Sequence, residues 1–329
     1  MTGALLQFVI SGAAIVLAGT VLTRCADAIA EATGLGRLLV GSILVASATS
    51  LPELLVDLNA ILRERMPDLA VGDLLGSSVM NLLILGVVDL LWRERGVMLS
   101  RRSAAHALSA TTSILLTVLV VLSLLRPSRT ELLGAGVGVW VVAGVYLLGV
   151  RLSFFDQRLM RKDDPDAGGR ERPLLRPILG FAASAVVLFF AAPFLANAAG
   201  RIADLTGLGT TFVGTTMVAL ATSLPELTST IVALRIGAPD LAIGNLFGSN
   251  AFNMLLLLPL DLAWPGALLA AVSPDHAITG LAAITISAVA ILGILYHAER
   301  RIWLIEPDAL LVVVLALGAF ALLYGARGG

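Results

Sequence analysis

The sequence predicts an all-α polytopic membrane protein with ten transmembrane helices, arranged as two inverted five-helix repeats with broken helices at the midplane. Three observations predict this fold. Hydrophobic residues make up 58% of the chain and charged residues only 14%, whereas an ordinary globular domain has about 25% charged residues. Apolar runs of the roughly 20 residues that cross a bilayer recur along the chain. The stretch A-S-A-T-S-L-P-E-L at 46–54 returns at 219–227 as A-L-A-T-S-L-P-E-L.

The composition excludes several classes of protein. Cys25 is the single cysteine, which excludes disulfides, cysteine zinc sites and iron–sulfur clusters. The net charge of −1 gives no sign of binding to nucleic acid. Nothing points to a resident cofactor or an obligate protein partner. The first apolar run is too long for the core of a signal peptide and is expected to remain as a helix in the lipid bilayer.

Each half of the chain contributes five spans. The N-terminal half, 1–151, holds the first copy of the repeat, and the C-terminal half, 177–329, holds the second. Residues 152–176 form a polar linker that is too short to be a domain. The predicted spans are 4–26, 39–62, 69–91, 103–125, 131–151, 177–199, 211–234, 241–262, 276–297 and 308–326.

The basic residues predict the orientation, because cytoplasmic loops are enriched in Lys and Arg. With the N-terminus outside, the cytoplasmic loops collect 15 Lys and Arg and the opposite loops collect six. We therefore expect both termini outside and the linker in the cytoplasm.

The repeat extends beyond the shared stretch. Val40–Leu54 and Val213–Leu227 are identical at 11 of 15 positions, and Pro67–Asn81 and Pro239–Asn253 at 9 of 15. Because five crossings is an odd number, the two copies enter the membrane in opposite directions. Inverted repeats are common in secondary transporters, whose substrate sites lie at the midplane where broken helices meet.

Four polar side chains fall at the middle of apolar spans. Glu53 and Glu226 belong to the second and seventh spans, and Asn81 and Asn253 to the third and eighth. A carboxylate at that depth is costly and indicates a functional site. In the structural alternative, these residues only join helices by hydrogen bonds, and that alternative is stronger for the asparagines.

Each glutamate follows a proline. Pro52 and Pro225 have no N–H, so the helices are expected to break there and to leave carbonyls without partners. Hydroxyl side chains lie beside these glutamates and asparagines, at Thr49, Ser50, Ser77, Thr222, Ser223 and Ser249. A site built only from oxygen suits a hard cation such as Ca²⁺, which takes roughly 6–8 oxygen ligands. One Ca²⁺ neutralises the two carboxylates, as do two Na⁺ or two protons, whereas an empty site is a buried double charge. Charge therefore favours exchange over leak.

Both copies contain T-S-L-P-E followed by G-(N/D)-x-x-G-S-(N/S)-x-x-N. On these motifs nearly the whole chain resembles the cation/Ca²⁺ exchanger superfamily, and within it most of all the prokaryotic Na⁺/Ca²⁺ exchanger branch. The resemblance implies antiport of Ca²⁺ for Na⁺ by alternating access in a prokaryotic plasma (inner) membrane, with Glu53 and Glu226 as the main Ca²⁺ ligands. It also implies that Asn81 and Asn253 form a central pair. The same six hydroxyls and the carbonyls of Ala46 and Ala219 would complete the Ca²⁺ and Na⁺ subsites.

The chain departs from the family pattern in three places. Asn253 replaces an aspartate that several Na⁺/Ca²⁺ exchangers have, which leaves Na⁺ coupling open. Asp73 and Ser78 stand where asparagines are usual, and Asp57 stands where Ser or Thr is usual. Asp57 and Asp73 lie toward the outer side, whereas their counterparts Thr230 and Asn245 are neutral. The two aspartates are expected either to form an acidic outer vestibule or to be surface carboxylates that pair with Arg63 or Arg65.

Three other functions remain as alternatives. A Ca²⁺/H⁺ antiporter would use the same two glutamates to carry protons, although that branch typically has G-N-A-x-E around its glutamate. A membrane-embedded enzyme is a distant alternative, because the sequence has no H-E-x-x-H motif and no Ser/His pairing. A channel is disfavoured because the predicted site is a closed cage.

Overall fold

The computed structural model describes residues 1–92, 106–162, 173–206, 219–296 and 307–325. These residues are almost entirely helical. Among them, eight helices are long and apolar enough to cross a membrane, and a shorter apolar helix covers Asp308–Leu323. The predicted all-α, multi-pass membrane class is therefore confirmed. Residues 163–172 of the linker and 211–218 of the seventh predicted span lie outside the described residues.

The chain divides into two compact units. The first unit comprises Met1–Leu55 and Met160–Asn245, and the second comprises Val56–Leu159 and Leu246–Gly329. Each unit takes segments from both predicted five-helix halves. Three helices contribute residues to both units, namely α3 (Ala46–Asn59), α10 (Pro239–Ala263) and, by its last three residues, α6 (Val137–Lys162).

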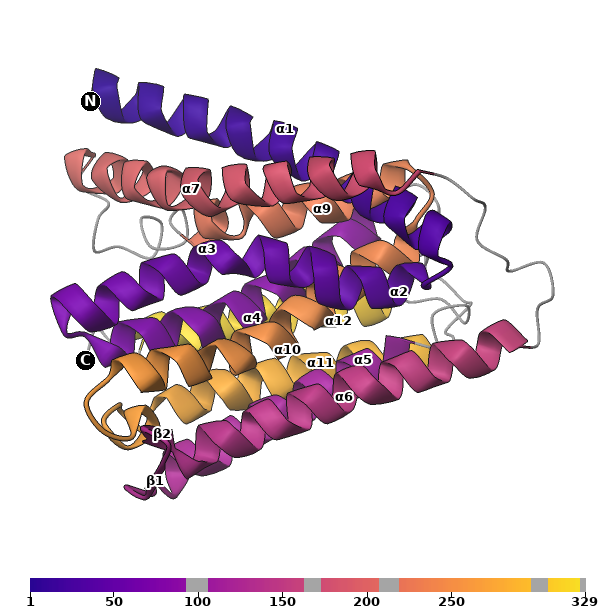
Figure 1. The fold of residues 1–329 in the computed structure, drawn as a ribbon. Helices are drawn as coiled ribbons and strands as arrows, with labels where there is room; N and C mark the ends of the chain where they lie inside the picture. The colour runs from indigo at the N-terminus through magenta and orange to yellow at the C-terminus, as the bar shows by residue number, and fades with distance from the viewer. Residues whose placement is uncertain (93–105, 163–172, 207–218, 297–306, 326–329) are drawn as a thin grey trace. The chain divides into compact units, whose positions relative to one another are not determined.

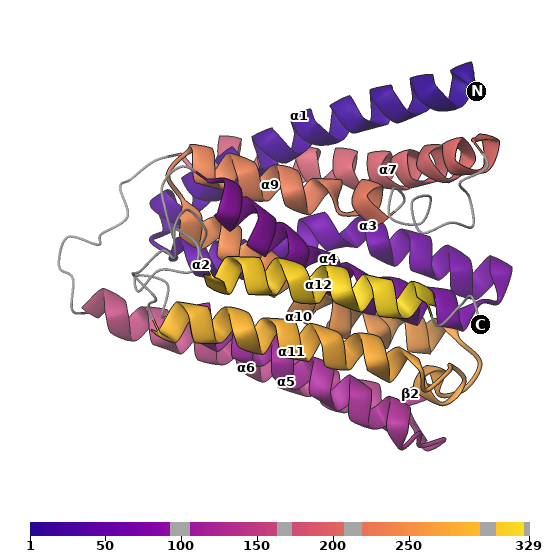
Figure 2. The same ribbon diagram turned by 180° about the vertical axis from the view of Figure 1, so that it is seen from behind.

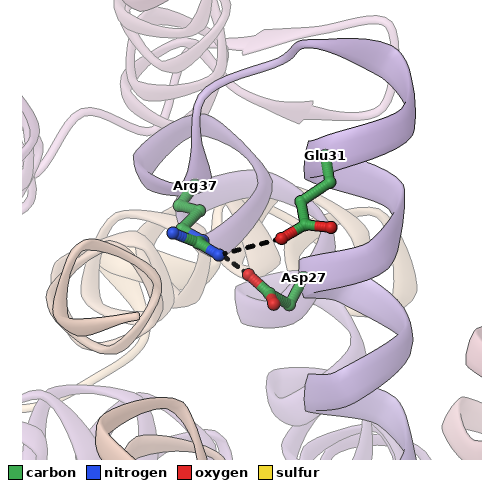
Figure 3. Close-up of polar contacts among 3 residues, drawn as sticks. All are labelled: Asp27, Glu31 and Arg37. Atoms are coloured by element: carbon green, nitrogen blue, oxygen red, sulfur yellow. Dashed lines mark hydrogen bonds and ion pairs between the residues drawn. The ribbon is translucent and has the colours of Figure 1, made fainter. Parts of the chain in front are cut away.

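In the first unit, α1 (Thr2–Thr33) lies along α7 (Leu175–Leu205), and α9 (Leu224–Arg235) packs against both (Figure 1). The turn after α1 is held by Arg37, the first residue of α2 (Arg37–Val40). Its Nε donates to Asp27 Oδ1 at 2.5 Å and its second guanidinium nitrogen to Glu31 Oε1 at 3.3 Å (Figure 3). One arginine therefore ties the start of the second span to the last two turns of α1.

The second predicted span is helical throughout. After α2 come the π-helical turn η1 (Gly41–Val45), then α3, then a second π-helical turn, η2 (Ala60–Glu64). The prediction of a break at Pro52 is wrong, because α3 continues through this proline. The first copy instead departs from α-helix at η1, directly before the signature, and π-turns of this kind are frequent at functional sites.

In the second copy the predicted interruption is present. Residues 219–222 are helical, Ser223 is a turn residue, and α9 begins at Leu224. Pro225 falls in the first turn of α9, where a missing N–H costs no intrahelical hydrogen bond. The same T-S-L-P-E letters thus produce a continuous helix in one copy and a helix start in the other.

In the second unit, α11 (His276–Tyr296) packs against α4 (Pro67–Leu91), α5 (His106–Leu125) and α12 (Pro307–Gly325), and α12 also packs on α4 (Figure 2). The strands β1 (Glu131–Leu132) and β2 (Ala135–Gly136) pair antiparallel, with Glu131 opposite Gly136 and Leu132 opposite Ala135. This hairpin precedes α6 (Val137–Lys162), and the short helix η4 (Leu268–Ala270) lies between α10 and α11. The core of this unit includes the buried Leu74, Leu75, Leu82 and Leu85 of α4.

Candidate functional site

The first unit brings the second span and the start of α10 into backbone contact. A Cβ atom placed on Gly41 would lie 2.5 Å from the carbonyl oxygen of Leu241, and one on Gly244 would lie 2.6 Å from the carbonyl oxygen of Leu38. Neither position has room for a side chain. These reciprocal glycines therefore let the backbones of the two helices come into direct contact, just before the first signature.

Thr49 and Thr222 make the same hydrogen bond in the two copies. The Thr49 hydroxyl donates to the carbonyl of Ala46 at 3.2 Å, and the Thr222 hydroxyl donates to the carbonyl of Ala219 at 2.9 Å. Because each hydroxyl donates its proton to that carbonyl, its lone pairs stay available to a cation. In both copies, the structure brings together a predicted hydroxyl ligand and a predicted carbonyl ligand.

Asn245 joins α10 to the first signature. Its Oδ1 lies 3.3 Å from the Thr49 hydroxyl, and its buried Nδ2 has no hydrogen-bond partner among the described residues. The Thr49 hydroxyl is also close enough to Glu226 to interact with it. Thr49 therefore lies beside both Asn245 and Glu226, which belong to different segments of the second copy.

The glutamates are buried in the same unit. Glu53 and Glu226 are 2% and 1% exposed. Within the described part of the chain, neither carboxylate oxygen of Glu226 has a hydrogen-bond partner, and the buried hydroxyl of Ser50 has none either. A buried carboxylate without donors is strongly destabilising unless a proton or a metal cation neutralises it. The oxygen atoms around Glu226 therefore suit a cation.

The first unit thus holds most of the predicted ligands, namely Glu53, Glu226, Thr49, Ser50, Thr222, Ser223, Ala46 and Ala219. The second unit holds the others, namely Asn81, Asn253, Ser77 and Ser249, and all four are buried.

The two central asparagines differ in their surroundings. Asn81 Nδ2 donates to Asn250 Oδ1 at 2.9 Å, and Asn250 Nδ2 donates to the backbone carbonyl of Ser78 at 3.2 Å. The Oδ1 of Asn81 has no partner among the described residues, and for Asn253 neither side-chain atom has one. The amide of Asn81 is therefore held by its neighbours, whereas the amide of Asn253 is not.

Asp57 and Asp73 lie inside the second unit. Asp57 is 1% exposed, and neither of its oxygens has a hydrogen-bond partner within the described residues, whereas Arg63 and Arg65 are exposed. Pairing of Asp57 with Arg63 or Arg65, one of the two alternatives from the sequence, is therefore wrong. Asp57 and Asp73 interact electrostatically, and Asp57 is buried while Asp73 is partly exposed.

The sequence pattern did not single out Asn245 as a partner of Thr49 or Asn250 as a partner of Asn81. Both belong to the second-copy motif G-N-L-F-G-S-N. An asparagine in an apolar span is itself a signal, because its amide requires a hydrogen-bonding or ionic partner there. The identity of that partner depends on packing between segments that are far apart in the sequence.

Several known proteins are similar to this chain. The family described as sodium/calcium exchanger protein matches residues 3–154 and 176–326. The putative antiporter CaxA of Alkalimonas amylolytica is 31% identical over 244 residues, which cover 71% of this chain and 72% of that protein. The inner membrane protein YrbG of Escherichia coli strain K12 is 30% identical over 275 residues, which cover 80% of this chain and 78% of that protein.

Two further similarities concern named exchangers. The sodium/calcium exchanger MaX1 of Methanosarcina acetivorans is 49% identical over 59 residues, which cover 18% of this chain and 17% of that protein. The solved structure of the sodium-calcium exchanger NCX_Mj soaked with 2.5 mM Na⁺ and 10 mM Sr²⁺ has a TM-score of 0.70 at 17% identity, and the match covers 97% of this chain and 98% of that one. The second similarity shows a shared fold. The family match extends over both copies of the repeat, and the chain therefore belongs to the sodium/calcium exchanger protein family.

Proposed function

We propose that this protein exchanges Ca²⁺ for Na⁺ across a prokaryotic plasma membrane by alternating access. The observation that carries the proposal is the buried carboxylate of Glu226, which lacks a hydrogen-bond partner among the described residues and lies in a signature repeated at Glu53. A carboxylate in a membrane-spanning region marks an ion pathway by default. Membership of an exchanger family supports the same conclusion, as does the similarity to an exchanger named for sodium and calcium.

The proposed ligands all offer oxygen. Glu53 and Glu226 supply the charge, and Asn81 and Asn253 form the central pair. Thr49, Ser50, Ser77, Thr222, Ser223, Ser249 and the carbonyls of Ala46 and Ala219 complete the Ca²⁺ and Na⁺ subsites. The repeated Thr-to-carbonyl hydrogen bonds support this set, because each places two of these oxygens together.

The proposed architecture has ten crossings in two inverted repeats, with both termini outside and the linker at 152–176 in the cytoplasm. The eight membrane-length helices, together with α9 and α12, support the number of crossings. The chain's own repeat supports the inversion, because the two copies lie five crossings apart.

The charge of the binding region couples the movement of Ca²⁺ to that of a counter-ion. One Ca²⁺ neutralises both glutamates, and so do two Na⁺. When either ion is bound, the binding region can switch from facing one side of the membrane to facing the other. When no ion is bound, the same switch would carry two uncompensated negative charges through a low-dielectric region. Return without a cation is therefore slow, and transport is coupled to a counter-ion.

The test is ⁴⁵Ca²⁺ uptake into proteoliposomes, driven separately by an outward Na⁺ gradient and by a proton gradient. We expect uptake with the Na⁺ gradient alone, and we expect Glu53→Gln and Glu226→Gln to abolish it. Ca²⁺ flux without any counter-ion gradient would contradict coupled exchange. Full activity of both glutamine variants would contradict the proposed site.

A Ca²⁺/H⁺ antiporter is the second candidate, and the neutral Asn253 favours it, because the site then lacks the aspartate found in several Na⁺/Ca²⁺ exchangers. Uptake driven only by the proton gradient would assign the protein to this alternative. In that case Asn253→Asp is the variant to examine for gain of Na⁺ coupling.

Asp57 and Asp73 are proposed to form an acidic vestibule that draws external cations toward the ligands. The electrostatic interaction between the two side chains supports this role, since nearby like charges favour a shared cation. We expect Asp57→Asn with Asp73→Asn to raise the external Ca²⁺ concentration for half-maximal uptake several-fold. Glu64→Gln, which changes an exposed carboxylate, is the matched control. An unchanged Ca²⁺ dependence in the double variant would rule the vestibule out.

A further inference from the structure

We infer that Asn250 is a positioning residue, which fixes the amide of Asn81 so that the Asn81 carbonyl oxygen, and not its N–H, is offered to the transported cation. The inference rests on the proposed function, because it gives Asn81 a role as an ion ligand. It assigns a role to a residue outside the proposed ligand set.

The argument begins at a backbone carbonyl. The carbonyl oxygen of Ser78 can only accept a hydrogen bond, so the Asn250 atom 3.2 Å away is the donor Nδ2. The other side of the Asn250 amide is then Oδ1, which can only accept. The Asn81 atom 2.9 Å from it must therefore be Nδ2. The backbone of Ser78 thus fixes the orientation of both amides in turn.

The remaining atom of Asn81 is its Oδ1. It is buried and has no hydrogen-bond partner among the described residues. Asn81 and Asn250 are only 1% and 2% exposed, so both amides are shielded from bulk water. A buried acceptor without a donor is costly, and a cation compensates that cost by direct coordination.

The second copy alone provides this support. Ser78 occupies the position in the first copy that Asn250 occupies in the second, and its hydroxyl donates to the carbonyl of Leu74 on its own helix at 3.0 Å. Asn253, the counterpart of Asn81, has no such partner among the described residues. The proposed central pair therefore consists of one amide whose orientation is fixed by hydrogen bonds and one whose orientation is not fixed by any hydrogen bond among the described residues.

Orientation matters because the two sides of an amide have opposite polarity. A rotated Asn81 would direct an NH₂ group toward a cation and repel it. Outer residues that orient a metal ligand typically contribute about 10- to 100-fold to metal affinity or activity. Asn250 is expected to act in this way, through Asn81 alone.

The test is equilibrium ⁴⁵Ca²⁺ binding to the purified full-length protein in detergent without Na⁺, normalised to monodisperse protein. We expect Asn250→Ala to weaken Ca²⁺ binding about tenfold. In an Asn81→Ala background the same substitution should have no further effect, because the residue through which Asn250 acts is absent. Asn250→Ser, which introduces the residue of the first copy, should weaken binding similarly and is the milder variant if the alanine form misfolds.

The matched control is Ser78→Ala, which removes a buried hydroxyl from the equivalent position and leaves the Ser78 carbonyl in place. Its Ca²⁺ affinity should equal that of the unmodified protein. Unchanged affinity in both Asn250 variants would overturn the inference, and so would losses that add fully in the double variant. Glu226→Gln separates the two proposals, since Ca²⁺ binding that survives this change refutes the proposed site whatever Asn250 does.

Discussion

At the scale of single residues, Asp261 and Glu226 are both buried carboxylates with opposite surroundings. Asp261 Oδ1 accepts the N–H of Gly136 at 3.1 Å, and its Oδ2 accepts the N–H of Leu268 at 3.2 Å. Glu226 has no such donor among the described residues. Asp261 is therefore satisfied by the protein itself and holds the β1–β2 hairpin and η4 in place, whereas Glu226 requires a cation or a proton.

We expect Asp261→Ala to lower stability by about 1–3 kcal/mol for each N–H that it leaves without an acceptor. Asp261→Asn keeps one acceptor and should be milder. Thermal unfolding in detergent measures the loss, and the Ca²⁺ dependence of uptake by the folded protein should not change. Asp275→Ala, which changes an exposed carboxylate in the loop before α11, is the control. An Asp261→Ala variant as stable as the control would contradict the assignment.

The site residues that were easiest to predict are those whose residue type is unfavourable in an apolar span. Glu53 and Glu226 could be predicted as site residues because a carboxylate deep in an apolar span is costly in any arrangement. Both are buried, as expected for that depth. The role of Asn250 could not be predicted, because its hydrogen bond to Asn81 joins positions 169 residues apart. The spacing of residues along one helix does not predict whether the oxygen or the nitrogen of an amide contacts a residue that is distant in the sequence.

At the scale of helices, the crossing of the second span with α10 depends on two glycines in the first unit. We expect Gly41→Ala and Gly244→Ala each to destabilise the protein and to reduce uptake, because the new methyl group would lie about one ångström inside normal contact with a backbone carbonyl. A backbone atom cannot move aside as a side chain can, so the cost falls near or above the roughly 1–3 kcal/mol typical of overpacking.

Gly200→Ala in α7 is the matched control, because an added Cβ there would meet no described atom within 4 Å. Alanine also favours helix over glycine, so this variant should be at least as stable as the unmodified protein. If Gly41→Ala and Gly244→Ala unfold at the same temperature as Gly200→Ala, the close crossing is not as the structure describes it.

The helices also show where a rule about single residues stops applying. Pro52 and Pro225 have the same missing N–H and the same flanking letters, yet α3 continues through Pro52 while α9 begins just before Pro225. The loss of one hydrogen bond can be predicted from the sequence. Whether the helix then ends depends on tertiary packing, which the local sequence does not determine. In the first copy the departure from α-helix falls at η1 instead.

At the scale of the whole molecule, the repeat and the packing divide the chain differently. The repeat predicts halves at 1–151 and 177–329, whereas each compact unit combines segments of both. The repeat predicts the direction in which each half crosses the bilayer. Packing shows which helices belong to the same compact unit. The signature of the first copy lies in α3, and the second motif of the second copy lies in α10. Both helices contribute residues to both units.

The inversion itself can be tested with two matched positions. Arg63 and Arg235 are exposed residues at the ends of corresponding helices in the two copies. In a Cys25→Ser background, we expect Arg63→Cys to react with a membrane-impermeant maleimide added outside intact cells. Arg235→Cys should react only after permeabilisation, because an odd number of crossings separates the two sites. Equal labelling from outside would mean parallel repeats and would refute the inverted architecture. A reversed pattern would keep the inversion and overturn only the predicted orientation, in which the distribution of Lys and Arg places both termini outside.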